Sequence, residues 1–128
     1  MNAYQTPAEL LKAIAHPTRL HILELLAHDE ACVCHLAAVL RRRQPYVSQH
    51  LMVLREAGLA LDRKDGVIVY YRLANPNVME LIAAARAVLR AAGQAVEPPP
   101  IPIGPVVGCP CPKCLEGGNC CPSKKARA

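Results

Sequence analysis

The spacing of apolar residues changes twice along the first 95 residues, and these changes limit the folds open to the chain. From about residue 7 to residue 58 the apolar side chains recur at helical spacing. Over residues 59–73 they alternate, and Asp65-Gly66 inside that stretch is a strong hairpin signal. Helical spacing returns from residue 78 to residue 92. The order predicts a mainly α chain with a β-hairpin wing (α+β), which is the arrangement of a winged helix-turn-helix.

Proline, glycine and short polar turns divide the helical parts into five expected helices. Thr6 is a candidate N-cap for the first of them, and prolines suit the first turn of the helices that follow. The expected starts are near Pro7, at Pro17, near Cys32, at Pro45 and at Val78, and the fourth and fifth helices end at Ala57-Gly58 and Gly93.

Composition restricts the core and the compartment. Apolar residues make up 52% of the chain, yet Phe and Trp are absent, so we expect a core of Leu, Ile, Val and Ala. No stretch approaches the ~20 apolar residues that span a bilayer. The N-terminus lacks the basic and apolar segments of an export signal. We therefore expect a cytoplasmic protein that makes no membrane contact.

The composition changes sharply near Glu97. Residues 98–105 read PPPIPIGP, and proline clusters of this kind form extended spacers. Five cysteines then follow between Cys109 and Cys121. The sequence predicts a winged helix-turn-helix domain at residues 1–95, followed by a Pro-rich linker and a Cys-rich tail at residues 96–128.

The turn before the fourth helix, that helix and the hairpin carry side chains suited to DNA. The formal charge is +5, and its basic residues cluster in the turn and the hairpin. In a helix-turn-helix the second helix enters the major groove, where Gln pairs with adenine and Ser with several partners. The alternative is an ordinary solvated helix face. The candidate DNA-binding residues are Arg41, Arg42 and Arg43 in the turn, Gln44, Tyr46, Ser48, Gln49 and His50 on the helix, and Arg63 and Lys64 in the hairpin.

Seven cysteines cannot all pair within one chain, and in a reducing compartment they are more typical of metal ligands or redox thiols. Cys32 and Cys34 lie at the start of the third helix, where both thiols can converge on one ion and the helix dipole favours thiolate. The alternative is that one or both are small buried apolar residues. The remaining candidate ligands are the tail residues Cys109, Cys111, Cys114, Cys120 and Cys121.

Closely spaced thiols suit thiolate-preferring ions, namely As(III), Sb(III), Cd(II), Pb(II), Zn(II) and Cu(I). His28 and His35 lie near the thiol pair and offer nitrogen donors, although surface histidines are the ordinary explanation. The chain shows no nucleophile and base constellation, no phosphate-binding Gly-rich loop and no paired carboxylates in a cleft-forming context. We do not expect an enzyme.

Five segments resemble the ArsR/SmtB family of metalloregulatory repressors. The resemblance covers about residues 7–93 and implies a homodimer, joined through the first and last helices, that binds operator DNA until an ion binds. It also implies thiolate ligands at Cys32 and Cys34. The segments are AHPTRL at 15–20, CVCHL at 32–36, VSQHL at 47–51, LREAGL at 54–59 and VYYRL at 69–73.

The resemblance also bears on the identity of the ion. Arsenic sensors of the prototype kind often carry a third cysteine on the same helix, but here His35, Leu36 and Ala37 follow the pair. We therefore expect the tail to supply the remaining thiolate ligands. Cys120-Cys121 resembles the adjacent cysteines with which some family members sense arsenite. As(III) is therefore the favoured effector.

Two other functions stay open on the sequence. One is a repressor of the same fold that senses oxidants or persulfides through a disulfide or polysulfide bridge between cysteines. The other is an ion-sequestering protein, in which the tail binds ions and the helices are only a scaffold.

Overall fold

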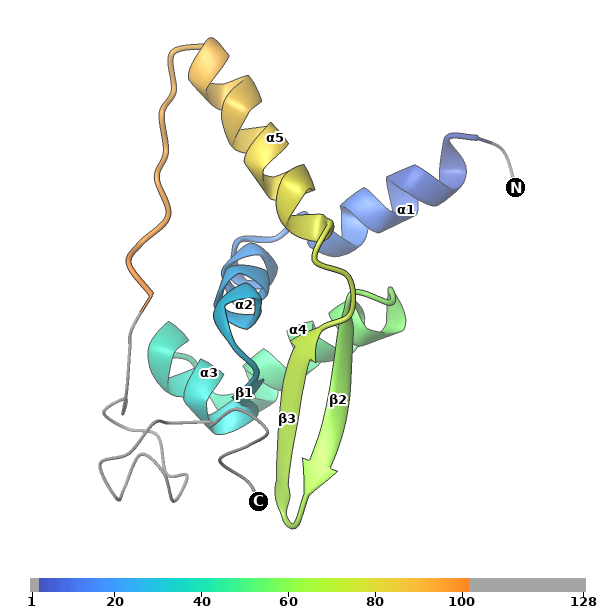
Figure 1. Ribbon diagram of the computed structural model, residues 1–128, viewed down its shortest axis with the longest axis vertical. Coiled ribbons are helices and arrows are strands. Elements are labelled where there is room, and N and C mark those ends of the chain that lie inside the picture. The colour runs from blue at the N-terminus through green and yellow to red at the C-terminus, as the bar shows by residue number, and fades with distance from the viewer. Residues whose placement is uncertain (1–2, 102–128) are drawn as a thin grey trace.

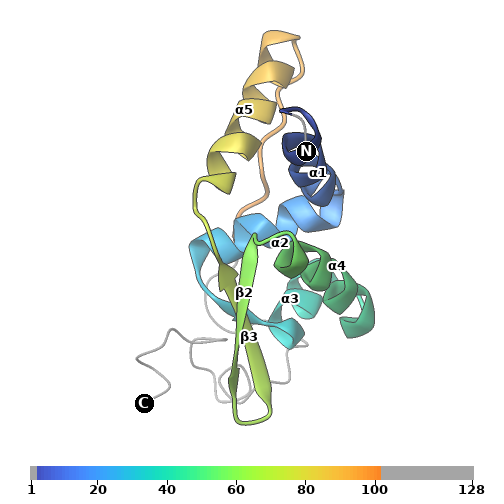
Figure 2. The ribbon, with the colours of Figure 1, turned by 90° about the vertical axis from the view of Figure 1, so that its right-hand side faces the viewer.

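The computed structural model describes residues 3–101, which form helices and a small antiparallel sheet in a winged helix-turn-helix (Figure 1). Helices α2, α3 and α4 pack together, and the β2–β3 hairpin extends from them as the wing. Helices α1 and α5 lie at the end of the molecule opposite the hairpin tip (Figures 1 and 2). The elements are α1 Gln5–Ile14, α2 Pro17–His28, β1 Ala31–Cys32, α3 Val33–Leu40, α4 Gln44–Glu56, β2 Ala60–Asp65, β3 Ile68–Leu73 and α5 Val78–Ala91.

Most helix ends lie where the sequence predicted them. Pro17 opens α2 behind His16, whose Nδ1 accepts a hydrogen bond from the Thr18 backbone N–H at 3.1 Å. Helix α4 ends just before Gly58, whose φ of +78° suits a residue without a side chain. The first helix differs, because it begins at Gln5 and Thr6 lies inside it. Pro7 fits within the first turn of that helix, where a missing N–H leaves no partner unsatisfied.

A short strand that the sequence did not predict joins the hairpin to α3. In this strand, β1, Ala31 pairs with Tyr71 and Cys32 pairs with Tyr70, so the sheet order is β1-β3-β2. Two residues are too few to show an alternating pattern. The consequence for the site is that Cys32 belongs both to the sheet and to the start of α3.

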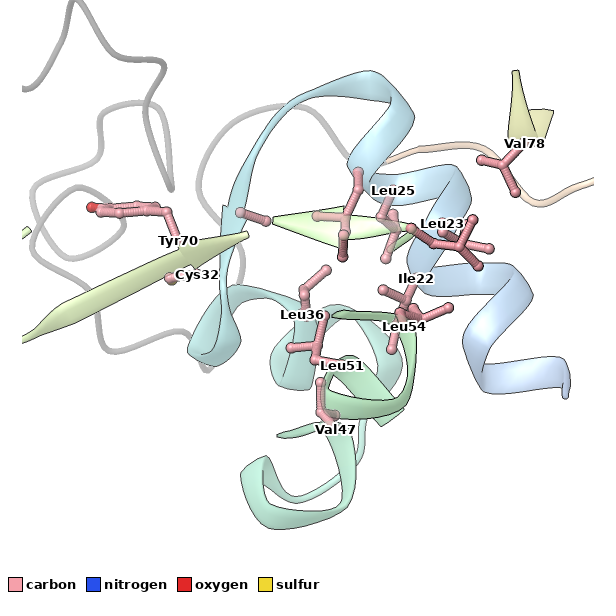
Figure 3. Packing of buried hydrophobic residues seen from close by; sticks show 14 of the residues in the cluster. Ile22, Leu23, Leu25, Cys32, Leu36, Val47, Leu51, Leu54, Tyr70 and Val78 are labelled. Carbon is pink, nitrogen blue, oxygen red and sulfur yellow. The ribbon is translucent and has the colours of Figure 1, made fainter. Parts of the chain in front are cut away.

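The core is aliphatic apart from Tyr70 and Cys32. Tyr70 is 1% exposed and is among the largest fully buried side chains, so the expectation of a core made only of Leu, Ile, Val and Ala was wrong (Figure 3). With no Phe or Trp in the chain, Tyr70 is the aromatic side chain of the buried cluster. The other fully buried side chains of large volume are Ile22, Leu23, Leu36, Leu51, Leu54, Val47 and Cys32.

Beyond α5 the chain turns back toward the middle of the molecule (Figure 1). Glu97 lies 3.7 Å from Arg90, and Ile101 packs against the buried cluster. The first part of the Pro-rich linker therefore contacts the domain. The tail cysteines lie outside the described residues. No helix within residues 3–101 is long and apolar enough to cross a membrane.

A thiol pair beside a candidate DNA-binding surface

The thiols of Cys32 and Cys34 converge at the N-terminus of α3. Cys32 is the N-cap residue with extended backbone, at φ −82° and ψ 163°, and its Sγ accepts a hydrogen bond from the His35 backbone N–H at 3.3 Å. Cys34 lies in the first turn, and its Sγ is 2.6 Å from that of Cys32. Because one residue is helical and the other is not, side chains two positions apart point to the same place.

The two thiols differ in burial. Cys32 is 1% exposed and is part of the core, as one alternative reading of the pair expected, whereas Cys34 is half-buried. They adjoin an open hollow of about 310 Å³ that Gln44 and Ser48 of α4 and residues 67–69 of the hairpin also line. A ligand at the thiols would therefore lie between the start of α4 and the wing.

The described residues alone do not complete a metal centre. Within residues 3–101, no group of three or more His, Cys, Asp or Glu side chains is arranged to hold a metal ion. His28 is exposed. Burial lowers the pKa of His35, and the nearby Cys34 and Asp29 only partly oppose this shift. A metal ion bound by Cys32 and Cys34 would need further donors from outside these residues.

The turn between α3 and α4 presents a basic surface. Arg41, Arg42 and Arg43 are all exposed, and their contact with phosphates stays a prediction. Arg41 adopts a left-handed conformation with φ 55°, a position that glycine occupies more often. Gln44 and Gln49 on α4 are also exposed, so their amides are accessible to base edges.

Tyr46 and His50, which the sequence assigned to DNA reading, contact the start of α2 in the structure. The Tyr46 hydroxyl is 3.1 Å from Thr18 Oγ1, and the His50 ring centroid is 4.3 Å from that of His16. Burial, followed by the charges of His16 and Arg19, lowers the pKa of His50. These contacts hold α4 against α2, a role that the sequence reasoning missed.

The two basic hairpin residues have different surroundings. Lys64 is exposed. Arg63 instead donates to Glu30, from Nε to Oε2 at 3.1 Å and from Nη2 to Oε1 at 2.5 Å, and this hydrogen bonding raises its pKa. Its Nη1 lies 3.7 Å from Asp65 Oδ2. Sequence reasoning missed Glu30, because an acidic residue between two helices looks like an ordinary solvated loop position.

Helices α1 and α5 expose aliphatic side chains at the end opposite the wing tip. Leu11 is 53% exposed and Val88 is 69% exposed, and exposed apolar side chains that form a contiguous patch are typical of an interaction site. Leu81 and Leu89 on α5 are exposed as well. Ile14 and Ile82, on the same two helices, pack inside the chain and are not part of this patch.

Comparisons with known proteins agree with this arrangement. A family model described as "Bacterial regulatory protein, arsR family" matches residues 16–60. The chain is 49% identical over 72 residues to the arsenical resistance operon repressor of Escherichia coli, which covers 56% of this chain and 62% of that protein. The crystal structure of Mycobacterium tuberculosis Rv0081 aligns with a TM-score of 0.64 and 39% identity, covering 72% of this chain and 93% of that one.

A solution structure from Mycobacterium bovis, described as a homodimeric winged helix-turn-helix domain of a possible ArsR-family regulator, aligns with a TM-score of 0.62 and 30% identity. It covers 74% of this chain and 90% of that one. The fold and these likenesses define a DNA-binding transcriptional regulator of the helix-turn-helix class, not an enzyme. Within that class, the chain belongs to the ArsR family.

Proposed function

We propose that this regulator is a repressor that binds operator DNA as a homodimer and releases it when a thiophilic ion binds Cys32 and Cys34. The observation that carries the proposal is the convergence of the two thiols, with Sγ atoms 2.6 Å apart, at the first turn of α3. That helix precedes the reading helix α4 across the three-arginine turn. A ligand held there bears directly on the DNA-binding unit.

The number of sulfur ligands that the ion needs suggests that cysteines of the tail complete the ion site. Two sulfur atoms are too few for As(III) or Cd(II), whose stable protein complexes take three or four. Soft thiolates are the ligands that these ions prefer. Cys120 and Cys121 are the leading candidates, and Cys109, Cys111 and Cys114 are the others. As(III) is the favoured ion, and Sb(III), Cd(II), Pb(II), Zn(II) and Cu(I) share the chemistry.

The position of the linker supports this role for the tail. Because Ile101 packs on the core, the chain has already returned to the domain before the first tail cysteine. The eight residue-to-residue steps from Ile101 to Cys109 span at most about 29 Å when extended. A relative named as an arsenical resistance operon repressor is consistent with the choice of As(III).

The DNA surface in this proposal comprises the exposed arginines of the turn, Gln44 and Gln49 on α4, and Lys64 on the wing. Phosphate contacts from the basic side chains position α4, and the amides read base edges. The exposed leucine and valine side chains of α1 and α5 form the dimer contact, which places two reading helices on two half-sites.

The test is a titration of operator DNA with the reduced full-length protein, followed by fluorescence anisotropy, with and without arsenite, Cd(II), Pb(II), Zn(II) or Cu(I). The wild type should bind without an ion and lose affinity when one of the ions binds stoichiometrically. Cys34→Ser should bind DNA normally and fail to release it. A chain truncated after Ile101 keeps the contact of that residue with the core but lacks the tail. Its ion-induced release, compared with that of the full-length protein, gives the contribution of the tail.

Three results would change the proposal. Failure of the ion-free protein to bind DNA would favour ion sequestration. Release by an oxidant or a persulfide donor, and by no ion, would favour the thiol redox reading. Equal release by the truncated chain would remove the tail cysteines from the site.

A further inference from the structure

The half-buried Arg63 forms an ion pair with the buried Glu30, and this pair connects the wing to the segment just before the thiols. Among residues 3–101, Glu30 is the one polar or charged residue that is buried, at 8% exposed. Both of its carboxylate oxygens accept hydrogen bonds from the Arg63 guanidinium, in the two-pronged geometry that fixes orientation as well as distance. Removing one partner of such a pair leaves a buried charge without compensation.

The same guanidinium lies over the ring of Tyr70, which is the neighbour of Cys32 on the adjacent strand of the sheet. Arg63 Cζ is 4.7 Å from the centroid of the Tyr70 ring, within the range of a cation–π contact. In the sheet, Tyr70 pairs with Arg63 on β2 and with Cys32 on β1. Directly opposed residues place their side chains on the same face. Cys32, Tyr70 and Arg63 therefore form one row across three strands.

The segment from Glu30 to Cys32 is thus attached to the wing at both ends. Glu30 holds it through Arg63, and Cys32 holds it through the pairing with Tyr70. Since Cys32 also caps α3, any shift of this residue on ion binding acts on the wing as well as on the helix. Buried, closely packed contacts of this kind transmit small displacements.

We propose that Arg63 is a positioning residue of the wing and that the Glu30–Arg63 pair couples the thiol site to the wing, which rests on the function proposed above. The carboxylates of Glu30 and Asp65 offset the Arg63 charge, so it adds little to the attraction for phosphate. Lys64, exposed and adjacent, is a wing cation that contacts the DNA backbone. This assignment removes Arg63 from the DNA-binding residues that the sequence predicted.

Net charge separates the two roles of Arg63. Glu30→Gln makes the protein more positive and Arg63→Gln makes it less positive. If Arg63 bound a phosphate, the two substitutions would have opposite effects on DNA affinity, and Arg63→Gln would lower the salt slope by about 0.9. The positioning role predicts that both substitutions weaken operator binding by the ion-free protein and leave the salt slope unchanged. Lys64→Gln is the matched control and should lower the slope.

The coupling is measured in the same anisotropy titrations as the ratio of operator Kd with and without arsenite or Cd(II). Glu30→Gln and Arg63→Gln should each reduce that ratio by about threefold or more, the range that substitutions in a coupled network produce. Lys64→Gln should leave the ratio as in the wild type. The double variant should be no worse than either single variant, because the two side chains act as a unit.

Each failure has a separate signature. A wild type that shows no ion-induced release would overturn the proposed function together with the coupling. The salt slopes of the variants would still test the positioning role of Arg63. A wild type that responds while both variants show the same ratio would overturn the coupling alone. A smaller salt slope in Arg63→Gln would overturn the positioning role. If the glutamine variants unfold below assay temperature, Arg63→Lys, which keeps the charge but cannot form the two-pronged hydrogen bonds, serves in their place. The positioning role predicts weaker operator binding and a smaller ratio in Arg63→Lys, whereas an operator affinity equal to that of the wild type would overturn it.

Discussion

Replacing Cys32 by serine should destabilise the domain less than replacing it by alanine. The Cys32 side chain caps α3 by accepting the His35 N–H, and serine is one of the best residues for that role. Losing an N-cap of this kind costs about 0.5–2 kcal/mol. The buried serine hydroxyl has the same N–H as a partner, which offsets much of the penalty of about 1–3 kcal/mol for an unsatisfied polar group. We therefore expect serine to be the more stable variant by about 1 kcal/mol.

Thermal unfolding in reductant and chelator measures this difference, with all proteins at one concentration because dimerisation links stability to concentration. A difference of 1 kcal/mol corresponds to about 4–8 °C in Tm for a domain of this size. Serine and alanine at Cys34, which is not the cap residue, are the matched control and should differ by less than about 0.5 kcal/mol. Equal Tm values for the two Cys32 variants would refute the capping role of its thiol.

Three further outcomes follow from the structure. Arg42→Ala should weaken binding to all DNA sequences and reduce the salt slope, whereas Gln49→Ala should mainly relax sequence preference, which competition with random duplex measures. Val88→Glu should give monomers in sedimentation, with Leu11→Glu as a second variant on α1. Because the pKa of His50 is lowered in the folded state, the folded chain binds that proton less readily than the unfolded chain, and stability should decline as pH falls below about 6.5. His50→Gln should show a smaller decline in thermal unfolding over the same pH range.

The sequence predicted the helices and the hairpin well because their signals are local. Prolines mark the starts of α2 and α4, Gly58 follows the end of α4, and Asp65-Gly66 lies at the hairpin turn. It did not predict β1, because two residues carry no periodicity. Nor did it predict a buried tyrosine, since the aliphatic composition gave no reason to place the Tyr70 ring inside.

For the candidate site, the sequence identified the types of residue but not their partners. The sequence predicted that Cys32 and Cys34 can converge because they lie at the start of a helix, and in the structure their Sγ atoms lie close together. The contacts of Arg63 with Glu30 and of His50 with His16 join residues more than 30 positions apart. Residue type alone suggests DNA contact for Arg63 and His50, because such long-range contacts leave no periodic signal.

The most direct test of the account compares the affinity of one ion for the free protein and for the operator-bound protein. Ion-induced release requires, by thermodynamic linkage, that DNA weaken ion binding by the same factor by which the ion weakens DNA binding, typically about 5–150-fold. Titration of arsenite or Cd(II) against a competing dithiol chelator, under reducing conditions with and without saturating operator, measures both affinities. The account predicts that the operator-bound protein binds the ion more weakly than the free protein. It also predicts that Cys34→Ser loses ion binding. Equal ion affinities for free and operator-bound protein would contradict it.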